Sequence, residues 1–361
     1  MTPADSVSLD DPAVRDRLDV DGSYDRIHHL PEQCLDAWRQ AKDFRLPAGY
    51  ESVDKVVIVG MGGSAIAGDF LQALAFDHSR IPVTVVRDYR LPAWVDGRTL
   101  VVTCSHSGNT EEVLSAFEQS QAAPTKDLVI TTGGELARLA TSAGIPALVY
   151  DYPNVPRDAF GHAFIRLLVV GRALDMVDVD DARIESAVTA MQAQRLALEA
   201  ATQEASNPAK QTARRFAGNL PFTVGAEFMA PVARRWRTQV NENADVFGLW
   251  DELSELDHNL VVGLRHPADQ LRRIRAVFLD HESLHPRIRL RYGLTMQLFA
   301  NAGIQCQRLT FPQADRLAAQ LCAVHFGDLV SYYLAMLEGT RPVEIDNINW
   351  LKDQLARAPL P

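Results

Sequence analysis

Short apolar runs alternate with amphipathic stretches from residue 55 onward. Runs rich in valine, isoleucine and leucine predict buried β-strands, and the amphipathic stretches between them predict helices. Strands that alternate with helices in this way are typical of a doubly wound parallel sheet. In the first half we expect strands in KVVIVG (55–60), IPVTVVRDY (81–89), TLVVTCS (99–105), DLVITTG (127–133) and IPALVY (145–150).

The same rhythm returns in the second half of the chain, without an exact internal repeat. A predicted helix over 181–204, closed by Asn207-Pro208, bridges to this second cycle. Helices are expected between its strands and at its end, over 317–337 and 348–358. We expect strands in LPFTVGA (220–226), HNLVVGL (258–264), IRAVFLD (274–280) and QCQRLTF (305–311).

Two α/β domains in tandem are therefore the predicted architecture. The first 50 residues read as helical, with LPEQCLDAWRQAKDF periodic in apolar positions, and should pack as a cap on the first α/β domain. The predicted parts are an N-terminal helical extension (1–50), a first domain (51–180), a linker helix (181–210), a second domain (211–340) and a C-terminal helix (341–361).

Composition and charge narrow the class of protein. The 361 residues are 47% hydrophobic and 23% charged, which is ordinary for a globular protein. A formal net charge of −10 argues against a nucleic-acid partner or an anionic membrane surface. There is no apolar leader and no run of membrane length, so a cytoplasmic location is expected. The four cysteines lack C-x-x-C spacing, and His28-His29 has no second ligand pair, so no metal is expected.

The first strand runs into a glycine-rich turn, GMGGSA. Gly60, Gly62 and Ala65 satisfy the G-x-G-x-x-G/A spacing of a dinucleotide-binding turn. A dinucleotide site also needs an acidic residue about 20 positions further on, at the end of the second strand. Asp88 is the nearest candidate and lies later than that. The spacing alone therefore supports a dinucleotide only weakly.

A second turn, after TLVVTC, favours a smaller ligand. Ser105, Ser107 and Thr110 place hydroxyl groups where a strand gives way to a helix, and free helix N–H groups join them. This combination suits a single phosphate. A third turn of the same type, 131–136, follows the next strand. Serine, threonine and glycine are also ordinary turn residues, but three such turns on consecutive strands favour a phosphate site.

The segments GMGGSAIAGD, SHSGNTEEV and TTGGEL resemble the sugar isomerase (SIS) domain superfamily, whose loops bind phosphosugars without a metal. From about residue 55 to the C-terminus the chain more closely resembles the bifunctional phosphoglucose/phosphomannose isomerases. This resemblance implies two flavodoxin-like SIS domains, a homodimer with shared active sites and no cofactor. It assigns Gly62, Gly63 and Ser64 to the sugar, and Ser105, Ser107 and Thr110 to the phosphate. His106 departs from the family, which usually has a tyrosine there.

Aldose–ketose isomerisation needs a base that moves a proton between C2 and C1, and a cation or donor that holds the enediolate charge. The resemblance assigns the base to Glu242 in N-E-N and the enediolate contact to Arg157 in VPRDAFG. It assigns ring opening to Lys352 and to His258, which would come from the neighbouring subunit. Taken singly, each has an ordinary alternative: a solvated helix-end carboxylate, a surface ion pair, a helix-end lysine and a surface histidine.

The sequence thus predicts an isomerase that interconverts glucose 6-phosphate and mannose 6-phosphate with fructose 6-phosphate through a cis-enediol, in glycolysis and gluconeogenesis. Two alternatives stay open. One is a phosphosugar-binding regulatory protein, although no helix-turn-helix segment is evident. The other is an isomerase or etherase for amino-sugar phosphates. The arginine clusters at 272–275 and 287–291 read as solvated helix faces or partner contacts.

Overall fold

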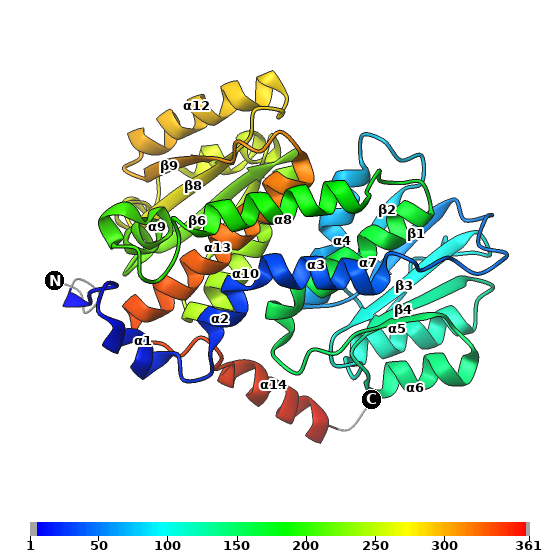
Figure 1. The fold of residues 1–361 in the computed structure, drawn as a ribbon. Coiled ribbons are helices and arrows are strands. Elements are labelled where there is room, and N and C mark those ends of the chain that lie inside the picture. The colour runs from blue at the N-terminus through cyan, green and yellow to red at the C-terminus, as the bar shows by residue number, and fades with distance from the viewer. Residues whose placement is uncertain (1–5, 359–361) are drawn as a thin grey trace.

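Two parallel β-sheets joined by long helices make up the computed structural model, which describes residues 6–358 (Figure 1). The first sheet and the second sheet lie on opposite sides of a set of helices that contact one another between them. These central helices are α3 (Leu30–Ala41), α7 (Phe160–Ala173), α8 (Asp181–Arg195) and α13 (Arg316–Glu338).

The strands of the first sheet are β1 (Lys55–Val59), β2 (Val83–Val86), β3 (Thr99–Ser105), β4 (Lys126–Thr131) and β5 (Ala147–Val149). All of them are parallel and run in the order β2-β1-β3-β4-β5. This is the flavodoxin-like order, which confirms the predicted fold class for this half. Every residue of β3 is buried, because the strand is central and helices cover both faces of the sheet.

Alternate residues of each strand pack into different layers of helices. Val57 of β1 packs with α5 (Glu111–Gln121) and α6 (Gly134–Ala143), which cover one face. Its neighbour Ile58 packs against α4 (Gly62–Ala75), which covers the other face with α7. The strand period of two thus explains why these segments read as continuous apolar runs.

The strands of the second sheet are β6 (Leu220–Ala226), β7 (Leu249–Leu253), β8 (Ile274–Asp280) and β9 (Gln305–Thr310). They are parallel and run in the order β7-β6-β8-β9, which repeats the first sheet without a fifth strand. Helix α10 (Ala230–Ala244) follows β6, α12 (Pro286–Asn301) follows β8 and α13 follows β9. The expected tandem arrangement is therefore confirmed.

The strand expected over 258–264 is wrong. This segment instead forms two 3₁₀ turns, η5 (Glu255–His258) and η6 (Leu260–Gly263). The side chain of Asn259 accepts a hydrogen bond from the N–H of Leu260 at 2.6 Å and so starts the second turn. The neighbour of β6 is β7, whose sequence LWDEL carries two acidic residues and lacks a clear apolar run. A short apolar run does not distinguish a strand from a helical turn by its pattern alone.

The N-terminal extension is helical and covers the central helices. It comprises α1 (Pro12–Leu18), α2 (Ser23–His28) and α3. Helix α3 packs against α7 and α8, and the buried Trp38 donates its indole N–H to Asp181 at 2.6 Å. The cap predicted from the sequence is therefore present.

The linker is shorter and more broken than the predicted helix over 181–204, because α8 ends at Arg195. A separate helix, α9 (Pro208–Phe216), begins where Asn207 accepts hydrogen bonds from two backbone N–H groups of its first turn. The polar pair Asn207-Pro208 is thus a helix start. Shorter turns are η3 (Glu204–Ser206), η4 (Glu227–Met229) and α11 (Ala268–Leu271).

The expected C-terminal helix is α14 (Asp346–Arg357), and none of its residues is buried. Its exposed apolar residues are Ile348, Trp350, Leu351 and Leu355. Residues 1–5 and 359–361, which fall in the first and last predicted ranges, lie outside the described residues. The domain limits themselves stay a prediction. Among residues 6–358, no helix is both long enough and apolar enough to cross a membrane.

Candidate active site

Three of the predicted ligand loops meet at one edge of the first sheet. They follow β1, β3 and β4, which are neighbours in the sheet, and parallel strands end at a common edge. A Cβ atom added at Gly60 would lie 3.2 Å from the carbonyl oxygen of Cys104, so the first loop touches the end of β3. The loops after β3 and β4 are in closer contact still, through Gly108 and Gly133.

The first loop opens helix α4 with small residues. Met61 is the N-cap and provides no side-chain hydrogen bond, so the first N–H groups of α4 have no side-chain partner. Gly63 lies against the η2 turn (Pro156–Ala159), because an added Cβ would be 3.1 Å from Pro156 O and 3.4 Å from Arg157 Cα. Gly62 is exposed and Ser64 is largely buried. The loop thus links the phosphate-type turns to the segment that carries Arg157.

The second loop arranges hydroxyl groups around the start of α5. The hydroxyls of Ser105 and Thr110 are 3.0 Å apart, and Ser105 Oγ also accepts the N–H of Gly108 at 3.0 Å. Ser107 is exposed and accepts the N–H of Asn109 at 3.2 Å. Thr110 is the N-cap of α5 without a side-chain cap bond, so the first N–H groups of that helix are available to an anion.

The third turn fixes the second one from behind. The hydroxyl of Thr132 donates to the carbonyl of His106 at 2.6 Å. Gly108 has a φ of +68° and faces the third turn, where an added Cβ would lie 1.9 Å from the carbonyl oxygen of Gly133. Only glycine fits this position, because the backbone conformation and the close approach both exclude a side chain.

We expect Gly108→Ala to weaken phosphosugar binding about 10-fold and to destabilise the fold about 2 kcal/mol more than a matched glycine replacement. Gly144→Ala is the matched control, because Gly144 has a φ of +67° and an added Cβ there meets no atom within 4 Å. Both variants carry the same backbone strain, and only Gly108→Ala adds the clash. Urea unfolding and calorimetric titration with fructose 6-phosphate measure the two effects. Equal stability and affinity in both variants would contradict this role of the loop.

His106, the departure from the family, is fully accommodated by its neighbours. Its Nε2 lies 2.9 Å from the carbonyl oxygen of Asn154, and its Nδ1 lies 3.2 Å from the hydroxyl of Tyr150. A carbonyl only accepts, so Nε2 carries the hydrogen and Nδ1 accepts from tyrosine. Burial lowers the pKa of His106, which favours this neutral form. The histidine thus ties the second loop to the chain that leads to Arg157.

Arg157 lies at the start of η2, with only 3% of its surface exposed. Its Nε donates to Asn243 Oδ1 at 2.7 Å, and its Nη2 donates to the carbonyl oxygen of Pro342 at 2.5 Å. Its Nη1 lies 3.5 Å from Glu242 Oε2. The guanidinium is therefore held by three partners from different parts of the chain, and each terminal nitrogen keeps an N–H for another acceptor.

Glu242 lies in the last turn of α10, where 29% of its side chain is exposed. Burial raises the pKa of its carboxyl group, while the charges of Arg157 and Arg235 oppose that rise. A carboxylate with a raised pKa takes up a proton more readily and therefore suits a general base. The pairing with Arg157 sets a base beside a permanent cation, which is the combination that enolisation requires.

His258 and Lys352 lie apart from this pair. His258 is exposed at the end of η5, and that turn is anchored by Asp257, which accepts from Arg291 at 2.8 Å and from Thr295 at 2.7 Å. Lys352 is exposed on α14. Across residues 6–358, no hydrogen bond or ion pair joins either side chain to Glu242 or Arg157. The two groups are therefore not brought into the site by this single chain.

Two further residues of the site escaped the sequence interpretation. Asn243 was noticed only as part of N-E-N, yet its side chain receives Arg157. Arg235 donates to the carbonyl oxygen of Arg157 at 3.1 Å and lies two helical turns before Glu242. That spacing places Arg235 and Glu242 on one face of α10 and was the available signal.

A metal site was not expected, and the described part of the chain is consistent with that. Among residues 6–358, no group of three or more His, Cys, Asp or Glu side chains could hold a metal ion. The positive charge next to Glu242 comes from Arg157.

The flavodoxin-like sheets and the three small-residue loops define a protein of the tandem SIS class. The fold matches the C-terminal domain of glucosamine-fructose-6-phosphate aminotransferase from Francisella tularensis, with a TM-score of 0.69. That match covers 89% of this chain and 98% of the other at 16% identity, and so supports the fold alone. Residues 205–355 match the family model described as the bacterial phospho-glucose isomerase C-terminal SIS domain.

Full-length relatives identify the family. The chain is 35% identical to a bifunctional phosphoglucose/phosphomannose isomerase of Caldicellulosiruptor bescii, over 92% of this chain and 98% of the relative. It is 32% identical to a protein of the same name from Aquifex aeolicus, over 84% of this chain and 90% of the relative. The chain belongs to the bifunctional phosphoglucose/phosphomannose isomerase family.

Proposed function

We propose that this protein interconverts fructose 6-phosphate with both glucose 6-phosphate and mannose 6-phosphate. Family membership supports the reaction, because the relatives are named for both isomerase activities. The observation that carries the proposal is the carboxylate of Glu242 held 3.5 Å from the buried guanidinium of Arg157. A regulatory protein would need the phosphate loops but not this paired base and cation.

The phosphate of the substrate would bind at the start of α5. Ser107 and Thr110 offer accessible hydroxyls there, and Ser105 holds the loop from below. The uncapped N–H groups of α5 add a positive partial charge that favours a dianion. The first loop, with Gly62, Gly63 and Ser64, would then lie along the sugar toward Arg157.

Proton transfer would use Glu242 as the base. The carboxylate removes the proton from C2 of an open-chain aldose and returns it to C1, so a cis-enediol is the intermediate. The negative charge that develops on the sugar oxygens would be held by the remaining N–H groups of Arg157, which stays charged at any working pH. Return of the proton to either face of C2 would give glucose 6-phosphate or mannose 6-phosphate.

Ring opening is assigned to His258 and Lys352. His258 is exposed on its own subunit, which is compatible with a role in the site of a second copy. We therefore propose a homodimer with shared active sites, as the family resemblance implies. Lys352 would approach from α14, whose residues are all exposed. The reaction would belong to glycolysis and gluconeogenesis in the cytoplasm.

Purified protein supplied with fructose 6-phosphate is expected to form both glucose 6-phosphate and mannose 6-phosphate. The two products are quantified separately by chromatography, and glucosamine 6-phosphate is tested as a competing substrate. Because the same Glu242 and Arg157 serve both epimers, inorganic phosphate should inhibit both product channels with one inhibition constant. Tight phosphosugar binding without any turnover would favour a regulatory protein, and turnover of the amino sugar alone would favour an amino-sugar enzyme.

A further inference from the structure

A buried ion pair lies directly behind Arg157. Arg235 of α10 donates to both carboxylate oxygens of Asp328 of α13, at 2.6 and 3.1 Å. The two side chains are only 1% and 6% exposed, and the guanidinium of Arg235 stacks 4.5 Å from the ring centre of Phe160. A buried ion pair is a weak source of net stability, because removing both charges from water opposes their attraction. Its other contacts are therefore the informative feature.

The ion pair holds the main chain of Arg157. Besides its two bonds to Asp328, Arg235 donates from Nη2 to the carbonyl oxygen of Arg157 at 3.1 Å. The guanidinium is planar and its N–H groups point in fixed directions. Asp328 therefore sets the orientation of the whole fork, and the fork sets the position of the Arg157 carbonyl.

A second chain of hydrogen bonds holds the side chain of Arg157. Its Nε donates to Asn243 Oδ1 at 2.7 Å, and Asn243 Nδ2 donates to Ser331 Oγ at 2.9 Å. The Ser331 hydroxyl in turn donates to the carbonyl oxygen of Asp328 at 2.7 Å. Asn243 and Ser331 are buried. Both holds on Arg157 therefore originate from a single turn of α13, between Asp328 and Ser331.

We propose that Asp328 and Ser331, acting through Arg235 and Asn243, are positioning residues that fix Arg157 beside Glu242 during isomerisation. This inference rests on the proposed function. Neither Asp328 nor Ser331 needs to touch the substrate. The phosphate loops, which hold the ground state, are built by a different part of the chain, so loss of the positioning contacts acts on kcat more than on KM.

Arg235→Lys is the sharpest variant, because it keeps the charge and removes the fork. A lysine has a single nitrogen and does not hold Asp328 in two places while also reaching the Arg157 carbonyl. We expect kcat to fall about 10- to 100-fold, since a displacement of about 1 Å at a reacting centre has effects of this size. KM should change less than about 3-fold. Ser331→Ala, which removes one oxygen, should lower kcat by about 10-fold.

Arg195→Lys is the matched control. Arg195 also bridges a carboxylate and a backbone carbonyl, with Nη1 2.9 Å from Glu32 Oε2 and 3.0 Å from His28 O. It lies on α8 and contacts the N-terminal helices instead of Arg157. Its replacement should reduce thermal stability without separating kcat from KM.

The pH profile supplies a readout that a merely structural role does not move. The charged groups that face Glu242 are Arg157 and Asp158 from η2 and Arg235 from its own helix. Arg235 lowers the pKa of Glu242, and Asp328 partly neutralises Arg235. Asp328→Asn should therefore lower the pKa of Glu242 further and move the acid limb of kcat to lower pH. A folded Asp328→Asn variant with an unshifted acid limb would count against the proposal.

Binding of an enediolate mimic separates this inference from the isomerase proposal. In 5-phospho-D-arabinonate the carboxylate occupies the place of the enediolate oxygens. Its affinity should fall about 10-fold in Arg235→Lys, while the affinity for inorganic phosphate stays at the wild-type value. If the wild type turns over no hexose phosphate, the isomerase proposal fails, and this comparison still decides the positioning role.

The proposal is wrong if folded Arg235→Lys and Ser331→Ala both keep kcat and analogue affinity within about 2-fold of Arg195→Lys. If Arg235→Lys does not fold, Ser331→Ala alone decides the matter, because it leaves the buried ion pair in place.

Discussion

Glu242→Gln is expected to lower kcat for fructose 6-phosphate about 10³-fold, which is the usual contribution of a general base. Glutamine has the same shape and keeps a hydrogen-bond acceptor beside Arg157, so the site should stay assembled. An amide takes up no proton from C1 or C2 at working pH. Affinity for the phosphosugar should therefore stay near the wild-type value while turnover collapses.

The measurement is best made in D₂O, because a base that exchanges its proton with solvent leaves deuterium at C2 of the product. Wild-type protein should introduce deuterium into glucose 6-phosphate, and Glu242→Gln should introduce almost none. Asp245→Asn is the matched control, since it makes the same chemical change at the exposed C-cap of α10. Asp245 has a φ of +52°, where asparagine is well tolerated. Comparable losses in both variants would show that Glu242 has no special role.

The first sheet could be predicted almost completely from the sequence. Strands buried on both faces need apolar residues at every position, so β1 and β3 stand out as continuous runs. The turns after these strands are equally visible, because an uncapped helix start and a left-handed backbone demand small residues such as Gly62 and Gly108. In these segments the local sequence and the fold impose the same requirement.

The contacts of Arg157 could not be predicted in the same way. Its partner Asn243 is 86 residues away in sequence, and the carbonyl oxygen that it meets at Pro342 is 185 residues away. Hydrogen bonds across such separations leave no periodic pattern. The edge strand β7 was missed for a different reason: it is paired only with β6 and carries charged residues, so burial imposes little on its sequence.

His258 and Lys352 show the limit of a single chain. The resemblance gives both a role in ring opening, yet both side chains are exposed and neither contacts Glu242 within residues 6–358. An exposed η5 turn that is itself firmly held through Asp257 is compatible with presentation of His258 to a second subunit. The role of each residue therefore stays a prediction that depends on the assembly.

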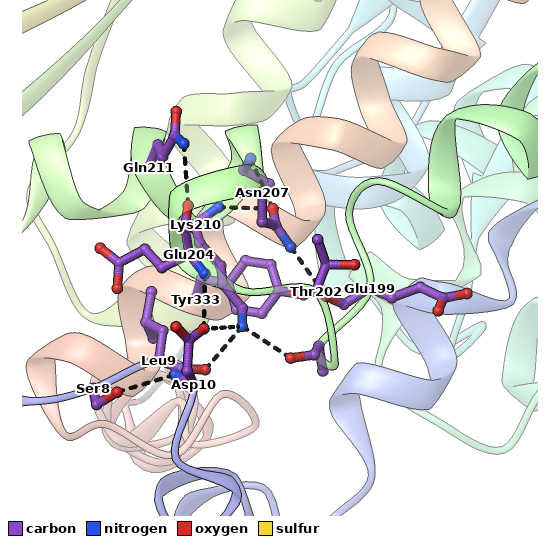
Figure 2. Close-up of polar contacts among 12 residues, drawn as sticks. Ser8, Leu9, Asp10, Glu199, Thr202, Glu204, Asn207, Lys210, Gln211 and Tyr333 are labelled. Carbon is purple, nitrogen blue, oxygen red and sulfur yellow. Dashed lines mark hydrogen bonds and ion pairs between the residues drawn. The ribbon is translucent and has the colours of Figure 1, made fainter.

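A second large effect is expected at Lys210, whose side chain is fully buried in α9. Its ammonium donates to the carbonyl oxygens of Leu9 at 3.0 Å and Ala200 at 2.9 Å, and to Asp10 Oδ1 at 2.8 Å (Figure 2). It also lies 5.7 Å from the ring centre of Tyr333 in α13. One cation thus ties the N-terminal segment and the linker to the core of the second domain.

Lys210→Met should destabilise the protein by about 3 kcal/mol, because methionine fills the space but leaves buried carbonyl groups without a donor. Lys42→Met is the control: its ion pair with Asp181 is substantially exposed, so its loss should change stability by about 0.5 kcal/mol. Urea unfolding at neutral pH measures both. The hydrogen bond from Lys210 lowers the pKa of Asp10 below its ordinary value of 3.8. This part of the stabilisation is therefore present above pH 3.8 and lost as the pH falls through the lowered pKa, so the gap between wild type and Lys210→Met should narrow in acid. A Lys210→Met variant as stable as Lys42→Met would mean that water replaces the ammonium at no cost, and the N-terminal segment would then be held by its apolar contacts alone.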